Sequence, residues 1–178
     1  MGRVFEYIVV NPVRDLDRYW AFAEPQFAKN GDRRISYEVV ASVYQRFEGI
    51  TANVQRIMNM LYMLTPKGET CTLDMIGRAI DTYLQLSSAY YSELLRQMPE
   101  KQRNVFLAIA AEGQVKYISG GKFVHKYHLP STSSVVSAVK GLLEKDFITQ
   151  NDNVYCIYDR FFQLWLDETY GNRGAGTV

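Results

Sequence analysis

The sequence predicts a mainly α-helical chain in which a helical bundle precedes a second domain that contains a small β-hairpin. Apolar residues recur at helical spacing through the first half, and capping and turn residues separate these runs. After Met98-Pro99, short β-favouring segments occur among further helical runs. We therefore expect an extended lead-in over 1–13, a helical domain over 14–98, a second domain over 99–170 and a disordered tail over 171–178.

The composition excludes several classes of protein. The 178 residues are 47% hydrophobic and 22% charged, which is typical of a globular protein. Twenty basic and nineteen acidic residues leave a formal net charge of +1, so no excess charge indicates nucleic acid or anionic lipid. Cys71 and Cys156 lie far apart, which favours a reducing compartment. Because the start is neither a signal peptide nor a membrane span, we expect a cytoplasmic protein without membrane contact.

The first two helices are predicted from their caps and stops. Asp15 is placed to cap a helix that ends near Asn30-Gly31, and Pro25 within this helix predicts a split or a kink. Ser36 is expected to cap the next helix, and Gly49 is expected to stop it.

Two further helices complete the first half. Thr51 opens the third run, and Thr72 opens a long fourth run that Ser87-Ser88 could interrupt. Apart from an extended lead-in over 5–10, no strand pattern occurs in this half of the sequence. The first half is therefore predicted to be helical.

The second half predicts a different order of elements. A helix begins at Pro99 and ends at Gly113, and a brief β-favouring segment, two turns of helix and a turn at Pro130 follow. The remaining elements are a helix capped by Ser131 or Thr132, a hairpin around Asn151-Asp152-Asn153 and a final helix capped by Asp159. The order helix, strand, helix, turn, helix and two-stranded wing predicts a winged-helix domain, a variant of the helix-turn-helix.

No motif predicts catalysis, a metal site or a cofactor bound by this chain alone. Gly121-Lys122 lacks the glycine and the hydroxyl residue of a phosphate loop, because Lys116 and Phe123 stand at those positions. His125 and His128 have no cysteine or carboxylate pair at metal-site spacing. We therefore expect no enzyme activity from these residues.

The helix after Ser131 is a candidate DNA-contacting helix. Helical spacing predicts a buried stripe of Val135, Val136, Val139, Leu142 and Leu143. The outward residues would donate to phosphates together with two lysines of the preceding helix, and the whole set is Lys122, Lys126, Ser133, Ser134, Ser137 and Lys140. The helix carries no Arg, Asn or Gln to read bases, so weak or nonspecific DNA contact and a protein-contact role both stay open.

The segment around Gly49 and Thr51 is a second candidate site. A helix that starts after a glycine presents free backbone N–H groups, which suit a phosphate, and Arg56 would add charge. The alternative is an ordinary capped helix in which Gln55 and Asn59 are buried hydrogen-bonding groups or surface residues.

Two sets of sequence motifs resemble the helical lid and winged helix of archaeal-type AAA+/STAND P-loop ATPases, which are also common in gut Bacteroidetes. The lid motifs are Tyr19-Trp20-Ala21-Phe22-Ala23 and Phe47-Glu48-Gly49-Ile50-Thr51, followed by Asn59-Met60-Leu61-Tyr62. The winged-helix motifs include Lys140-Gly141-Leu142-Leu143-Glu144-Lys145 and Tyr158-Asp159-Arg160-Phe161-Phe162. The family usually has an aromatic pair where this chain has Ala52-Asn53.

This resemblance implies that the chain is the non-catalytic C-terminal region of a longer ATPase. Its partner would be a missing N-terminal core that binds ATP and Mg, while this chain binds no cofactor of its own. Gly49, Thr51 and Arg56 would face the nucleotide, with Arg56 as the second sensor. The alternatives are a standalone DNA-binding transcriptional regulator and a protein-interaction module.

Overall fold

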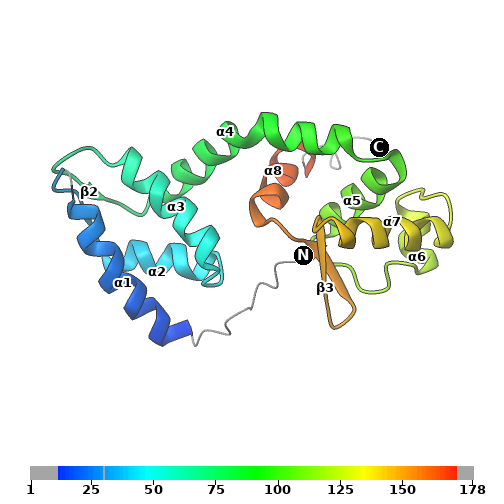
Figure 1. The fold of residues 1–178 in the computed structure, drawn as a ribbon, viewed down its shortest axis with the longest axis horizontal. Coiled ribbons are helices and arrows are strands. Elements are labelled where there is room, and N and C mark those ends of the chain that lie inside the picture. Colours follow the sequence, from blue (N-terminus) through cyan, green and yellow to red (C-terminus); the bar gives the residue numbers. More distant parts are fainter. Residues whose placement is uncertain (1–11, 30, 172–178) are drawn as a thin grey trace. The chain divides into compact units, whose positions relative to one another are not determined.

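The computed structural model describes residues 12–29 and 31–171 (Figure 1). Its contacts divide the chain into two compact units, Met1–Gln85 and Leu86–Val178. The division falls inside one continuous helix, α4 (Met75–Gln97), and so precedes the boundary expected at Met98-Pro99. Most of the expected lead-in and nearly all of the expected tail lie outside the described residues.

The first unit is helical, as predicted. Its elements are α1 (Pro12–Ala28), β1 (Arg34–Ile35), α2 (Tyr37–Arg46), α3 (Thr51–Leu64), β2 (Thr70–Cys71) and the first part of α4. Its core comes mainly from α2, α3 and α4, with Val39, Val40, Val43, Val54, Ile57, Leu61, Ala79 and Ile80 all buried.

The start of α1 differs from the prediction, and the helix is not split at Pro25. The helix begins at Pro12, so the prediction that Asp15 caps it is wrong. A proline is tolerated in the first turn because the N–H that it lacks would have no partner there. The helix also continues through Pro25. Ala23 and Phe27 are buried on either side of Pro25, and this packing offsets the lost hydrogen bond.

The caps of α2 are as predicted. The Ser36 hydroxyl accepts a hydrogen bond from the Val39 N–H at 3.4 Å. Gly49 has φ of +68°, and its N–H donates to the Tyr44 carbonyl at 2.8 Å. This left-handed residue closes the end of α2, and α3 then starts at Thr51.

Two features of the elements up to the end of α4 differ from the sequence-based expectations. Strands β1 and β2 form a parallel pair in which Arg34 lies opposite Thr70 and Ile35 opposite Cys71. Two-residue strands are too short to show an alternating pattern in the sequence. The long helix α4 also runs through Ser87-Ser88 without interruption.

The second unit has the predicted order of elements. It contains the end of α4, α5 (Glu100–Glu112), α6 (Gly121–Lys126), α7 (Thr132–Glu144), β3 (Ile148–Asn151), β4 (Val154–Ile157) and α8 (Arg160–Tyr170). Pro99 immediately precedes α5 instead of being its first residue. The β-favouring segment after α5 contributes an antiparallel bridge between Val115 and Tyr155 of β4.

The hairpin and the last helix start as the turn and capping residues predict. Strands β3 and β4 are antiparallel, and Asp152 and Asn153 at the tip have φ of 47° and 62°. Positive φ at both central residues is the geometry that two-residue hairpin turns prefer, and Asp and Asn tolerate it. The Asp159 carboxylate then caps α8 by accepting from the N–H groups of Phe161 and Phe162.

An aromatic cluster explains why the second unit begins inside α4. The ring of Tyr91 stacks on the ring of Phe162 in α8, with centroids 4.7 Å apart. The centroids of the Phe162 ring and the Phe106 ring of α5 are 5.1 Å apart. The Trp165 indole N–H donates to the Ser88 hydroxyl at 3.0 Å. The last turns of α4 are therefore part of the core of the second unit.

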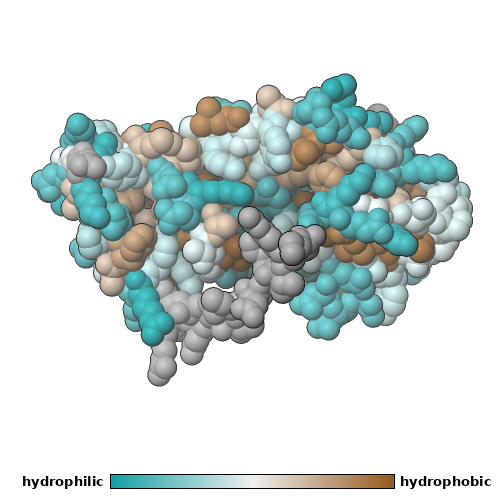
Figure 2. All heavy atoms as spheres, viewed as in Figure 1, coloured by the Kyte–Doolittle hydropathy of each residue, from teal (hydrophilic) through white to brown (hydrophobic). Residues whose placement is uncertain are grey.

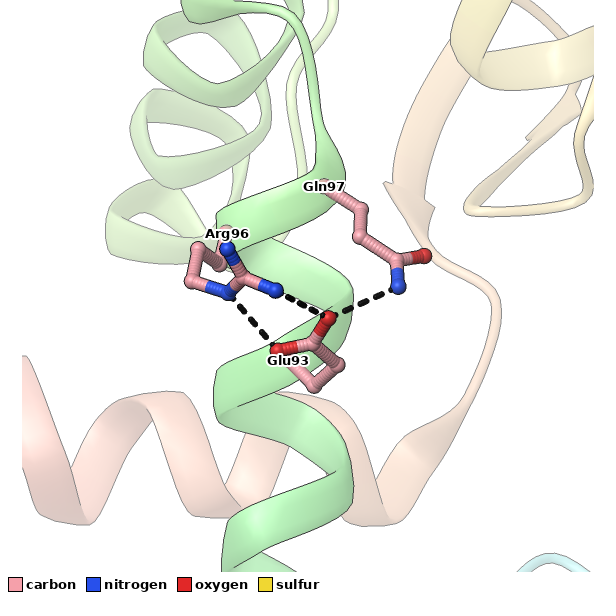
Figure 3. A network of polar contacts seen from close by, with 3 residues as sticks. All are labelled: Glu93, Arg96 and Gln97. Carbon is pink, nitrogen blue, oxygen red and sulfur yellow. Dashed lines mark hydrogen bonds and ion pairs between the residues drawn. The ribbon is translucent and has the colours of Figure 1, made fainter.

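A polar network lies at the exposed end of α4 (Figure 3). Arg96 donates two hydrogen bonds of 2.7 Å to Glu93, and Gln97 donates a third of 2.8 Å. These bonds, with Arg96 as the larger contributor, lower the pKa of Glu93 from 4.5 to about 2.

Within the described residues, no helix combines the length and apolarity needed to cross a membrane.

Candidate functional site

The N-terminal half of α7 presents small hydroxyl side chains. Ser131 caps the helix by accepting from the Ser134 N–H at 3.2 Å. Ser133 and Ser137 are exposed, whereas Ser134 is half-buried and its hydroxyl accepts from Ser131. Lys140 is exposed two turns further along. Three of the four residues predicted on this helix are therefore open to solvent.

The predicted buried stripe of α7 is wrong at Val136. This side chain is 54% exposed, and Leu143 is only half-buried. The buried residues are Val135, Ala138, Val139 and Leu142, which follow the spacing of a single helix face. Because Val136 lies about 100° around the helix from Val135, it falls between the buried face and the hydroxyl face.

The lysines of α6 and α7 differ in how strongly they are paired. In the part of the chain that the structure describes, Lys122 has no ion-pair partner. The Lys126 ammonium lies 2.5 Å from the Glu112 carboxylate, and their hydrogen bond lowers the pKa of Glu112 and raises that of Lys126. Lys140 Nζ lies 4.0 Å from Glu144 Oε1. Both side chains are exposed, so this ion pair contributes little to stability. Lys122 and Lys140 are therefore the more available cations.

The distribution of charge along the second unit is uneven. Between Glu112 and Glu144 the sequence contains four lysines and no Asp or Glu. This segment forms the loop before α6, α6 itself and most of α7. The Thr132 hydroxyl donates to the Ser119 carbonyl at 3.4 Å, and this bond connects the loop to the start of α7. We use the name lysine surface for six of the exposed residues of this segment: Lys116, Tyr117, Lys122, Ser133, Ser137 and Lys140.

An unusual tyrosine belongs to the lysine surface. Tyr117 is 86% exposed and has φ of 40°, which is rare for a bulky residue. Lys116 and Tyr117 were not predicted as part of the candidate site, because acids and bases balance when charge is summed over the whole domain. A charge count over a shorter window would have found the acid-free segment.

The wing adds no positive charge to this surface. Strands β3 and β4 and the turn between them contain no Lys or Arg, and their one charged residue is Asp152. Helix α7 offers no Arg, Asn or Gln that could form bidentate hydrogen bonds with bases. The arrangement suits contact with an anionic backbone and not the reading of a base sequence.

The predicted phosphate corner is built around the turn between α2 and α3. Thr51 is the exposed first residue of α3, and Ile50 precedes the helix without a side-chain cap. Arg56 is exposed, with its guanidinium 6.0 Å from the ring centroid of Tyr83 in α4. The positive φ of Gly49 is needed to close α2, so its presence has a structural explanation that requires no ligand.

The structure answers the open question about Gln55 and Asn59. Gln55 is half-buried, accepts a hydrogen bond from Tyr19 and donates one to Asn59, which is exposed. The ring of His125 in α6 and the ring of His128 just after this helix have centroids 6.4 Å apart. Among residues 12–29 and 31–171, no group of three or more His, Cys, Asp or Glu is placed to hold a metal ion.

The helices α5, α6 and α7 followed by the β3–β4 hairpin define a winged-helix domain of the helix-turn-helix class. Residues 89–168 match the family model described as a probable winged helix domain. The match starts inside α4 and ends in α8, and so it covers most of the second unit. No curated protein matches the chain, and no solved structure matches it. A winged helix contacts DNA or protein.

Proposed function

We propose that this winged helix contacts the phosphate backbone of duplex DNA without reading its sequence. The observation that carries the proposal is the lysine surface, which places Lys116, Lys122 and Lys140 in a segment with no acidic residue. Ser133 and Ser137 are small donors that let α7 approach a duplex closely. The absence of base-reading side chains on α7 makes the contact independent of sequence.

The size of the lysine surface sets the strength of the expected interaction. Each phosphate neutralised by a lysine contributes about −0.9 to the slope of log affinity against log salt concentration. Three available lysines therefore predict a slope of about −3. Nonspecific binding of this kind has dissociation constants of roughly 10⁻⁴–10⁻⁶ M at physiological salt.

The test measures fluorescence anisotropy of a short labelled duplex at several salt concentrations. The variants Lys122→Ala and Lys140→Ala should each weaken binding equally for unrelated sequences and reduce the salt slope by about 1. Lys101→Ala is the matched control, because Lys101 is exposed near the start of α5 and outside the lysine surface. No binding at low salt, or an equal loss in the control, contradicts the proposal.

One observation favours protein contact as a second candidate function. Val136 is an exposed apolar side chain on α7, close to the hydroxyl residues. On the face shown in Figure 2, however, apolar residues are interspersed with hydrophilic ones. The variant Val136→Lys separates the candidates: the added charge strengthens duplex binding if α7 faces DNA and leaves it unchanged if α7 faces a protein.

We further propose that the chain is the non-catalytic, cytoplasmic C-terminal region of a longer P-loop ATPase. This proposal is supported only by the resemblance of the motifs around Phe22 and Gly49 to the helical lid of those enzymes. In that arrangement ATP and Mg would bind the core, with Gly49, Thr51 and Arg56 facing the nucleotide. A phosphate loop in frame upstream of Met1 would support it, and ATP turnover by the purified chain would reject the non-catalytic role.

A further inference from the structure

A groove between α1 and α3 in the first unit has a lining suited to a ligand. Its volume is about 310 Å³, at the lower end of the range for pockets that bind small groups. The apolar lining consists of Tyr19, Phe22, Ala23, Phe27, Met58 and Tyr62. Phe22 is 52% exposed although it belongs to this aromatic group, so the groove leaves a large apolar surface in contact with solvent.

The walls of the groove are held by contacts between the two helices. The Tyr62 hydroxyl of α3 donates to the Lys29 carbonyl just after α1 at 2.8 Å. The rings of Phe27 and Tyr62 meet edge to face with centroids 5.6 Å apart. The rings of Tyr19 and Phe22 lie 6.2 Å apart along α1. The groove is therefore formed before any ligand binds, which limits the entropy cost of binding.

The hydrogen bonds within the lining leave amide N–H donors for a ligand. The Tyr19 hydroxyl donates to Gln55 Oε1 at 3.2 Å, and Gln55 Nε2 donates to Asn59 Oδ1 at 3.0 Å. Burial raises the pKa of Tyr19 to about 12, so its hydroxyl stays protonated and can donate. The carbonyl oxygen of each amide thus accepts one bond within the chain, and the Asn59 amide N–H groups remain to donate.

The other end of the groove has the same polarity. Lys29 Nζ donates to Gln26 Oε1 at 3.0 Å, which leaves the N–H groups of Gln26 to donate. No Asp or Glu lines the groove, and the Arg33 guanidinium lies 4.4 Å from the ring centroid of Tyr62. The groove therefore combines aromatic walls with amide donors and positive charge, and it is complementary to an apolar group beside acceptors or negative charge.

We propose that this groove binds an extended peptide segment of a protein partner, in which an aromatic side chain is flanked by acidic residues. The aromatic side chain packs among Phe22, Phe27 and Tyr62, since edge-to-face contacts between rings are favourable. The flanking carboxylates and backbone carbonyls accept hydrogen bonds from Asn59, Gln26 and Lys29. This site is in the first unit and does not depend on the function proposed for the winged helix.

The test titrates the isotope-labelled full chain with three peptides and follows backbone amide NMR signals. The peptides are acetyl-Asp-Phe-Asp-amide, the matched acetyl-Lys-Phe-Lys-amide and the anchor-free acetyl-Asp-Ala-Asp-amide. We expect the first peptide to shift signals of α1 and α3 around the groove and to bind at least tenfold more tightly than the other two. Equal binding of the acidic and basic peptides, shifts confined to other elements, or no shifts at all overturns the proposal.

Two variants and a matched control locate the site. Asn59→Asp keeps the size of an exposed side chain but replaces its donors with a carboxylate. It should therefore weaken binding of the acidic peptide at least tenfold and leave binding of the basic peptide no weaker. Phe22→Ala should weaken binding of the acidic peptide to a similar extent. Met63→Ala is the control, because Met63 is 61% exposed on α3 and does not line the groove. If Met63→Ala weakens binding as much as Phe22→Ala, the groove is not the site.

Discussion

The substitution Gly49→Ala tests the account of the turn between α2 and α3. Gly49 has φ of +68°, and a non-glycine residue in this left-handed region costs about 1–2 kcal/mol. A Cβ at this position would also lie 2.9 Å from Cε1, Cζ and Oη of Tyr44. Tyr44 is buried, and the centroid of its ring lies 6.1 Å from that of the Tyr19 ring, so the Tyr44 ring has little room to move. Overpacking of this kind costs about 1–3 kcal/mol more.

Gly68→Ala is the matched control for this substitution. Gly68 has φ of +78°, but a Cβ there would meet no atom within 4 Å. The control should therefore lose only the backbone contribution of about 1–2 kcal/mol. The free energy of unfolding in urea, followed by circular dichroism, should fall by about 2–5 kcal/mol for Gly49→Ala. Equal losses in the two variants would refute the argument that Tyr44 excludes a side chain at position 49.

Three further predictions follow from local contacts. Gly77→Ala should raise the unfolding free energy by about 0.5–1 kcal/mol, because Gly77 lies within α4 with no atom within 4 Å of a Cβ; a loss of stability would contradict this. Asp159→Ala should cost about 1 kcal/mol in urea unfolding by removing the cap of α8, while Asp159→Asn, which can still cap, should cost less. The pKa of Glu93 is lowered, so its contribution to stability is present above pH 4.5 and is lost as the pH falls through about 2. An NMR titration should show that Arg96→Ala returns the Glu93 pKa toward 4.5, and an unchanged value would exclude the role of Arg96.

The elements of the second unit could be predicted well because their signals are local. Ser131 and Asp159 each bond to an N–H two or three residues away, and the positive φ values of Asp152 and Asn153 suit their own side chains. Such signals depend on neighbouring residues in the chain. The caps, the hairpin and the order of the helices were therefore visible in the sequence.

The candidate site was predicted less completely. Ser133, Ser137, Lys122 and Lys140 are exposed as expected, but the exposure of Tyr117 was missed. The groove between α1 and α3 could not be foreseen either, because it depends on side chains from two helices that are far apart in the sequence. The hydrogen-bonding groups that the groove offers a ligand depend on which partners the side-chain amides bond to in the folded structure.

The sequence by itself determined where helices and turns form, since periodicity and capping act over a few residues. Only the tertiary structure decided which faces of those helices are covered. Val136 is exposed because the buried side of α7 runs through Val135 and Ala138, and Lys126 is neutralised because Glu112 of α5 lies beside it. Contacts between distant segments set the burial and the effective charge of each side chain, and these two properties determine what the surface can bind.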